Sequence, residues 1–136
     1  MASIWLFKTE PGAYSYDQLE RDGKTVWDGV KNPVARKHIA EVKRGDQVLV
    51  YHTGDEKAVI GIAKALSDGY PDPKQKDPKA AVVDLAPVAR LKRPVTLAEL
   101  KQLATLKSFP LVRLPRLSAM PVSAAEWKEI ERLSRA

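Results

Sequence analysis

Cysteine is absent from the 136-residue chain, and histidine occurs only twice, at His38 and His52. Without cysteine there is no disulfide, no thiolate metal site and no cysteine nucleophile. The two histidines show no metal-ligand spacing, so we expect no metal site. The absence of cysteine also fits a reducing compartment, and we expect a cytoplasmic protein.

Long apolar runs are missing as well. No segment approaches the roughly 20 apolar residues that a membrane-spanning helix needs, and the first three residues lack the basic region of a signal peptide. We therefore expect a soluble protein with no membrane partner. The length predicts a single domain over residues 1–136 that buries its own core as a monomer.

The usual catalytic motifs are not found either. The sequence contains no GxSxG, no HExxH, no glycine-rich phosphate loop and no set of zinc ligands. We expect no catalytic residues, no cofactor and no enzyme activity. One alternative stays open, because Glu10, Asp28 and Asp72 would bind magnesium if they converged, as in a metal-dependent nuclease.

Charge is unevenly distributed. The net charge is +6, yet residues 1–30 carry 3 basic and 5 acidic groups, so the excess of positive charge lies in residues 31–136. A basic surface attracts phosphates without sequence preference. The charge is equally compatible with a role in solubility alone.

Apolar patterning predicts five strands, and turn residues separate them. Gly61 and Pro87 predict bulges or a sheet edge within two of these strands. Strands dominate the pattern and helices are inserted between them, which indicates an α+β protein built on a small, strongly bent sheet or barrel. The expected strands cover residues 3–8, 46–53, 58–66, 80–91 and 111–117.

Capping residues mark four helices. Ser15 begins a short one, and Asn32 followed by Pro33 begins a second, which we expect to end at Gly45. Thr96 with Glu99, and Ser123 with Glu126, form two capping boxes.

The polar end of the first strand and a nearby tryptophan predict a ligand pocket. Lys8, Thr9 and Glu10 end the strand, and Trp27 precedes the turn at Asp28–Gly29. An aromatic surface, a flexible backbone and a few ionisable groups suit a flat polar ligand such as a nucleobase. From the residues alone Trp27 fits a core position better than a stacking position.

Other polar residues also have two interpretations. The cap at Asn32 would leave the amides of Val34 and Ala35 able to donate to a base or a phosphate. Arg36 suits either an ion pair or a phosphate contact. His52 is expected to be buried and hydrogen-bonded, although His52 and Thr53 could reach a pocket at the frayed strand end.

The loop after residue 66 offers a further set of candidates. Tyr70, beside Pro71 and Pro73, would form a lid or a rigid solvent loop. Lys74 and Lys76 would line a phosphate-binding rim or remain solvated.

The segments WLFKTEP, WDGVKN, GDQVLVYHT, YPDP and LKRPVTLAELK, in this order, resemble the EVE domain family. The resemblance covers nearly the whole chain. It implies a PUA-like pseudo-barrel of about five to six strongly bent strands with peripheral helices, related to the YTH and ASCH domains. It also implies a nucleic-acid-binding module that recognises a modified base, most of all a modified cytosine in DNA such as 5-methylcytosine. Binding of modified RNA is the alternative.

The resemblance turns the candidate residues into an expected site and makes Trp27 a pocket wall. Thr9 and Thr53 stand where the family commonly has serine, and each keeps a hydroxyl. Lys31 replaces a common arginine and loses its bidentate fork. The expected base pocket comprises Lys8, Thr9, Glu10, Trp27, Gly29, Val30, Lys31, Asn32, His52, Thr53 and Tyr70, and the expected backbone-binding residues are Arg36, Lys74 and Lys76.

Overall fold

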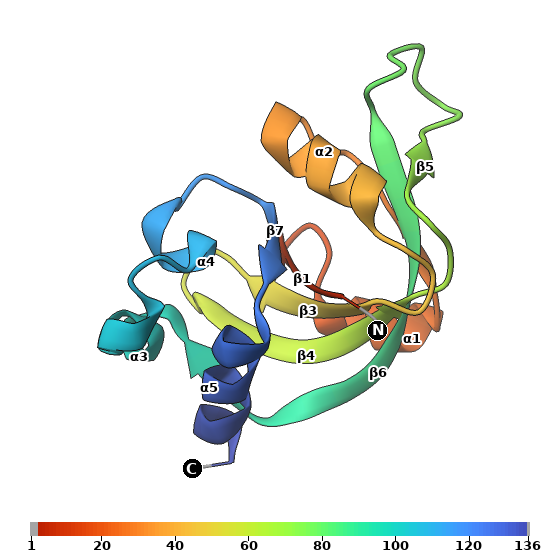
Figure 1. Cartoon of the computed structure of the whole chain (residues 1–136). Coiled ribbons are helices and arrows are strands. Elements are labelled where there is room, and N and C mark those ends of the chain that lie inside the picture. Colours follow the sequence, from red (N-terminus) through yellow and green to blue (C-terminus); the bar gives the residue numbers. More distant parts are fainter. Residues whose placement is uncertain (1–2, 136) are drawn as a thin grey trace.

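One curled sheet organises the protein in the computed structural model, which describes residues 3–135 (Figure 1). Six strands follow the order β2-β6-β4-β3-β1-β7, and the very short β5 pairs with β6 beside this path. The α+β fold with strongly bent strands is therefore confirmed. The strands are β1 (Ile4–Thr9), β2 (Thr25–Trp27), β3 (Gln47–His52), β4 (Ala58–Ala65), β5 (Tyr70–Pro71), β6 (Ala81–Thr96) and β7 (Ala119–Val122).

Helices surround the sheet, and their starts follow the capping residues of the sequence. Ser15 caps α1 (Tyr16–Asp22), and Asn32 caps α2 (Pro33–Glu41). Capping boxes begin α3 (Leu97–Lys101) and α5 (Ala124–Ser134). A 3₁₀ turn, η1 (Ala104–Leu106), and the short α4 (Pro110–Arg113) complete the set. No helix within residues 3–135 has the length and apolar character to cross a membrane.

The core lies inside the curl of the sheet. Both faces of the central strands are covered: Leu6 and the neighbouring Leu49 on one face and Phe7 on the other are all fully buried. The helices α1 and α2 add Leu19 and Ile39 to the same core. In Figure 1, α2 spans one end of the sheet while α5 lies against its other side.

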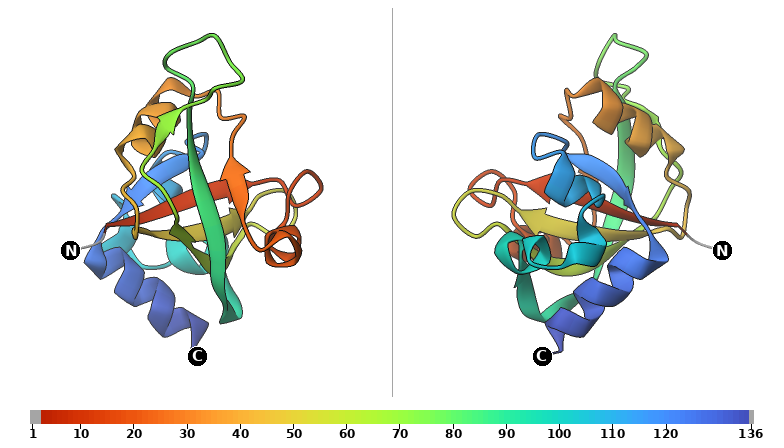
Figure 2. Two further views of the ribbon diagram at one scale, coloured as in Figure 1. Left: turned by 90° about the vertical axis from the view of Figure 1, so that its right-hand side faces the viewer. Right: turned by 60° about the vertical axis from the view of Figure 1, so that its left-hand side comes forward.

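The curl stops short of a closed barrel. Strands β2 and β7 stand at the two ends of the strand order and do not pair with each other. Figure 2 shows the short β2 beside the long β6. Here we call the gap between β2 on one side and the β1–β7 pair on the other the seam.

Irregular pairing bends the two longest strands where the sequence predicts it. The β4–β6 register shifts between Val59 and Gly61, and again between Ile62 and Ala63, opposite Pro87. A Cβ at Gly61 would lie 2.6 Å from the Tyr16 ring, so the bulge also makes room for this ring. Both predicted irregularities are confirmed.

Two predictions of secondary structure were wrong, and the strand expected over residues 80–91 continues as β6 to Thr96. Residues 111–117 form no strand, because Phe109–Pro110 begins the short α4 and a turn follows it. The second helix ends at Glu41 rather than near Gly45. Lys43 N donates to Asp46 Oδ2 and Arg44 N donates to Asp68 Oδ1, so these side chains form a turn where the sequence suggested another helical turn.

The capping box of α3 predicts a pH dependence of stability. Arg93 donates two hydrogen bonds to Glu99, of 3.0 and 2.6 Å, and together with the Thr96 amide it lowers the pKa of Glu99 to about 2. Because this pKa is depressed, the carboxylate stabilises the fold above its usual pKa of 4.5, and the contribution is lost as the pH falls towards 2.

We expect Glu99→Gln to lower the free energy of unfolding by about 1 kcal/mol at pH 7. Urea denaturation of both proteins at pH 7 and near pH 2.5 measures this difference, which should shrink at the lower pH. A difference that stays constant across this range would contradict the role of the charge.

Candidate functional site

A pocket of about 610 Å³ opens at the seam. Strand β2 with the segment that follows it, and the end of β1 with the turn after it, supply most of the wall, and one residue before β7 completes it. The pocket therefore lies where the sheet fails to close and where three segments distant in sequence meet. Its lining consists of residues 8–10, 13–14, 25–31 and 118.

Trp27 belongs to the core and to the pocket wall at once. Only 7% of it is exposed, and it lines the pocket. The Phe7 ring lies 5.7 Å from the indole at an angle of 43°, and the Tyr14 ring lies 6.2 Å away, edge-on at 90°. These two rings hold the indole in a fixed orientation. The core and pocket interpretations of the sequence are thus compatible in one side chain.

Tyr14 is an aromatic wall residue that the sequence interpretation missed. Its hydroxyl donates to Asp22 Oδ2 at 2.9 Å, and desolvation by burial raises the pKa of Tyr14. The phenol therefore stays neutral at physiological pH. The Pro11–Gly12 turn before it was the available signal, because the turn folds the chain back towards β1: the amides of Ala13 and Tyr14 both donate to Glu10 O.

The path of the chain after Trp27 depends on a glycine. Gly29 has φ of +75°, a conformation that costs little for glycine and is unfavourable for other residues. It directs the chain from the pocket wall into the cap of α2. Val30 and Lys31 follow it and line the pocket.

Hydrogen bonds fix the polar end of β1. Thr9 Oγ1 donates to Tyr14 O at 2.6 Å, so this hydroxyl holds the loop. Glu10 Oε2 accepts from Thr53 Oγ1 at 3.2 Å, and Glu10 Oε1 accepts from Gly12 N at 3.4 Å. The carboxylate is thereby oriented at the pocket, and Thr53 acts on the site through Glu10, outside the lining itself.

Lys8 places a restrained positive charge at the pocket. Its Nζ donates to Pro115 O at 2.8 Å and lies 5.7 Å from the centre of the Tyr51 ring. Burial lowers the pKa of Lys8 from its usual 10.5. These contacts hold the 114–118 loop against the end of β1.

Arg36 forms an ion pair with Asp77, which is one of the two roles that the sequence suggests for it. Its Nη1 lies 3.0 Å from Asp77 Oδ2, and its Nε donates to Val30 O at 2.7 Å. The side chain thus ties the β2–α2 segment to the β5–β6 loop. Much of the guanidinium is already engaged by the protein.

The helix cap differs from one expectation. The amides of Val34 and Ala35 are not free, because both donate to Asn32 Oδ1, at 2.9 and 3.0 Å. The prediction that they donate to a ligand was therefore wrong. Asn32 itself lines a neighbouring groove of about 360 Å³, together with Val34 and residues 114–117.

Two further expected pocket residues lie elsewhere. His52 is 4% exposed, accepts from Tyr16 N at 3.0 Å through Nε2, and contacts Glu56 Oε1 at 3.1 Å through Nδ1. The Tyr16 amide therefore fixes the proton of a neutral His52 on Nδ1. This buried, hydrogen-bonded role was its main expectation.

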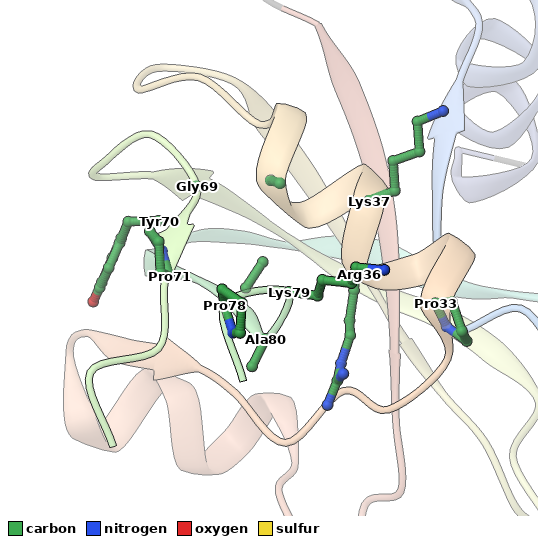
Figure 3. Close-up of a pocket in the computed structure, with 11 residues that line it drawn as sticks. Pro33, Arg36, Lys37, Gly69, Tyr70, Pro71, Pro78, Lys79 and Ala80 are labelled. Atoms are coloured by element: carbon green, nitrogen blue, oxygen red, sulfur yellow. The ribbon is translucent and has the colours of Figure 1, made fainter. Parts of the chain in front are cut away.

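Tyr70 lines a separate pocket of about 460 Å³ between α2 and the β5–β6 loop (Figure 3). Its hydroxyl donates to Asp84 Oδ1 at 2.7 Å, which raises the pKa of Tyr70 to about 12. Lys74 and Lys76 are exposed in the β5–β6 loop, outside the lining of either pocket.

The three carboxylates considered for a metal do not converge. Glu10 and Asp28 line the seam pocket, whereas Asp72 is 8% exposed and accepts from Lys74 N at 2.9 Å. Over the described part of the chain, no group of three or more candidate ligands could hold a metal ion.

The curled sheet with its peripheral helices defines a PUA-like fold. The chain superposes on the ASCH protein of Zymomonas mobilis with a TM-score of 0.59, over 96% of this chain and 95% of that one. At 11% identity this likeness concerns the fold alone.

The chain belongs to the EVE domain family, whose sequence model matches residues 3–133. It is 30% identical to human thymocyte nuclear protein 1 over 161 aligned positions, which cover 93% of this chain and 72% of the human protein.

Solved structures give the same result. A Rhodopseudomonas palustris protein solved by NMR is 37% identical and has a TM-score of 0.92, over 98% of this chain and 94% of that one. Human THYN1 protein, in a crystal structure with DNA that contains 5-methylcytosine, is 28% identical and has a TM-score of 0.89 over 99% of both chains.

Proposed function

We propose that this protein is a binding module for a modified base in DNA, most of all a modified cytosine, and that the seam pocket holds the base. The observation that carries the proposal is the rigid indole of Trp27 in the wall of a pocket of about 610 Å³. The family relationship supports it, because a human relative has been solved with DNA that contains 5-methylcytosine.

The pocket offers complementary chemistry for a flat, polar ring. Stacking of a base on an aromatic side chain contributes about 1–3 kcal/mol. The carboxylates of Glu10 and Asp28 are suited to accept from the exocyclic amine of cytosine. Lys8 and Lys31 supply positive charge for a phosphate beside the base. We propose binding without catalysis.

Removal of the indole tests the proposal. We expect wild-type protein to bind single-stranded DNA with one 5-methylcytosine more tightly than the same strand with cytosine, and Trp27→Ala to lose this preference. Loss of one stacking contact corresponds to a roughly tenfold or larger decrease in affinity. Fluorescence anisotropy at two salt concentrations measures it, with 5-hydroxymethylcytosine, duplex DNA and matched RNA as further probes.

Two controls make the test specific. Trp127→Ala removes another indole, half-buried on α5 and outside the pocket, and should leave the preference intact. Trp27→Phe should retain part of it. Equal binding of all forms, with a steep salt dependence and no effect of Trp27→Ala, would assign binding to positive charge alone and end the pocket proposal.

The remaining assignments are proposals of the same kind. Arg36, Lys74 and Lys76 would contact the nucleic-acid backbone, and each charge removal should weaken binding to all sequences equally and reduce the salt slope. We also propose a single-domain monomer in the cytoplasm. The animal relatives carry the word nuclear in their names, so microscopy of the tagged protein would test the location.

A further inference from the structure

Strand β2 pairs with β6 along one edge, and its other edge is unpaired. The hydrogen bonds of β6 show which N–H and C=O groups of β2 point towards β6 and which point towards the unpaired edge. Thr25, Val26 and Trp27 stand opposite Leu85, Asp84 and Val83. On β6, Asp84 O accepts from Leu66 N, and Asp84 N donates to Ser67 Oγ. The main chain of Asp84 is therefore engaged on the side away from β2.

The alternation of an antiparallel ladder then fixes the orientation of Val26. Because the N–H and C=O of Asp84 point away from β2, Val26 and Asp84 form a non-hydrogen-bonded pair. The hydrogen bonds between β2 and β6 then belong to the Thr25–Leu85 and Trp27–Val83 pairs. The N–H and C=O of Val26 consequently project from the free edge of β2 into the seam. Among the described residues none supplies a partner for them.

Val26 also borders the pocket in a way that suits a main-chain contact. All three residues of β2 line the pocket. The side chain of Trp27 is buried, whereas Val26 is 47% exposed, because successive side chains of a strand point to opposite faces. Val26 thus presents a donor and an acceptor at the strand edge beside the fixed indole.

We infer that the main-chain N–H and C=O of Val26 bind the hydrogen-bonding edge of the ligand base and select a cytosine ring over a thymine ring. This inference rests on the proposed function. In cytosine an acceptor, N3, adjoins a donor, the N4 amine, so Val26 N–H donates to N3 while Val26 C=O accepts from N4. In thymine the two adjacent groups have the opposite polarity, so a thymine in the same position opposes donor to donor and acceptor to acceptor.

The base thus takes the place of a missing neighbouring strand. A strand edge with unpaired polar groups is a natural site for an added hydrogen-bonding partner. Methylation at C5 leaves the N3–N4 edge unchanged. The Val26 contact therefore distinguishes a cytosine ring from a thymine ring, whereas the rest of the pocket recognises the 5-methyl group. Thymine carries the same 5-methyl group, which allows the two contributions to be separated.

The test removes one hydrogen atom from the main chain. Val26→Pro deletes the amide hydrogen at an edge position that pairs with nothing, where proline is tolerated. The matched control Val26→Ala changes the side chain and keeps the amide. We expect Val26→Pro to bind a single strand with one 5-methylcytosine about tenfold more weakly than Val26→Ala does, and to lose most of the discrimination against thymine at that position.

An altered ligand provides the complementary measurement on wild-type protein. In 5-methyl-3-deazacytosine a C–H replaces N3, so the amide of Val26 would lose its acceptor. We expect wild-type protein to bind this strand about tenfold more weakly than 5-methylcytosine, and Val26→Pro to show little difference between the two. If Val26→Pro does not fold by circular dichroism, the wild-type comparison decides alone.

Equal binding of 5-methylcytosine and its 3-deaza analogue by wild-type protein would overturn the inference. So would equal affinities of folded Val26→Pro and Val26→Ala. Neither result would contradict the proposal that the seam pocket binds the base. That proposal is tested separately, by the preference for 5-methylcytosine over cytosine and its dependence on Trp27.

Discussion

Replacement of Asp46 by alanine is expected to lower the free energy of unfolding by about 3 kcal/mol or more. Asp46 is 3% exposed, and its carboxylate accepts three hydrogen bonds. Its Oδ1 accepts from Ser3 N at 3.0 Å, and its Oδ2 accepts from Trp5 Nε1 and Lys43 N, both at 2.9 Å. Alanine would leave the buried indole N–H of Trp5 without a partner, which costs about 1–3 kcal/mol, and would also remove the hydrogen bonds of the part-buried amides of Ser3 and Lys43.

The position of Asp46 explains why one residue has such an effect. Trp5 lies at the start of β1 and Ser3 directly precedes that strand, whereas Lys43 belongs to the turn between α2 and β3. The carboxylate therefore ties the turn after α2 to the β1 side of the parallel β1–β3 pair. Loss of this connection weakens the support of β1, whose other end lines the seam pocket.

Urea denaturation followed by circular dichroism measures the change. Asp68→Ala is the matched control, because Asp68 also accepts from a main-chain amide, Arg44 N at 2.9 Å, but is exposed. We expect the control to cost about 1 kcal/mol or less. Asp46→Asn should fall between the two. An Asp46→Ala protein as stable as the control would show that the three donors find other partners.

The local elements of this fold were predictable because short-range chemistry determines them. Ser15, Asn32, Thr96 and Ser123 cap their helices through side-chain contacts two or three residues away. The apolar strands β1, β3 and β4 also follow their sequence pattern. Such signals lie within a few neighbouring residues, so one sequence suffices to read them.

The wrong predictions of secondary structure concern segments whose conformation depends on the rest of the fold. Residues 111–117 are rich in apolar side chains like a strand, yet Pro110 begins the short α4 and these residues take no place in the sheet. The turn after α2 depends on Asp68, which lies 24 positions from the amide of Arg44 that it binds. Such contacts are properties of the whole fold and leave no local signature.

The candidate site shows the same division. The end of β1 and strand β2 face each other across the seam. Their residues Lys8, Thr9, Glu10 and Trp27 therefore line one pocket, as the sequence predicts. Tyr70 lies at another pocket, since β5 pairs with β6 beside the main path of the sheet. Val26 and Ser118 join the lining through pairing that only the folded chain reveals, whereas Tyr14 is placed by the turn after Glu10.

Gly69→Ala is the second substitution expected to have a large effect, because it acts on the support of helix α2. A Cβ at residue 69 would collide with Ile39 O and lie 2.8 Å from Ala40 Cα and 2.9 Å from Ile39 C. All three are main-chain atoms of α2, which no side-chain rotation can move away. Gly69 N also donates to Val42 O at 2.9 Å, so the close approach carries a hydrogen bond.

We expect Gly69→Ala to lower the free energy of unfolding by about 3 kcal/mol, the upper range for overpacking of a rigid contact. Gly12→Ala is the matched control: its Cβ would lie 3.8 Å from Glu10 Oε1, an ordinary contact, and should change stability by less than about 1 kcal/mol. Urea denaturation compares the two variants, and a Gly69→Ala protein as stable as the control would contradict the steric argument.

Gly69→Ala should also change ligand binding, because it displaces helix α2. To accept the new methyl group, α2 or the segment before β5 must shift. The other end of α2 carries the Asn32 cap and the Arg36 contact to Val30 O, which position the wall after Gly29. Folded Gly69→Ala protein should therefore prefer 5-methylcytosine over cytosine less strongly than wild type. An unchanged preference would mean that the pocket wall is held from β2 alone, independently of the helix.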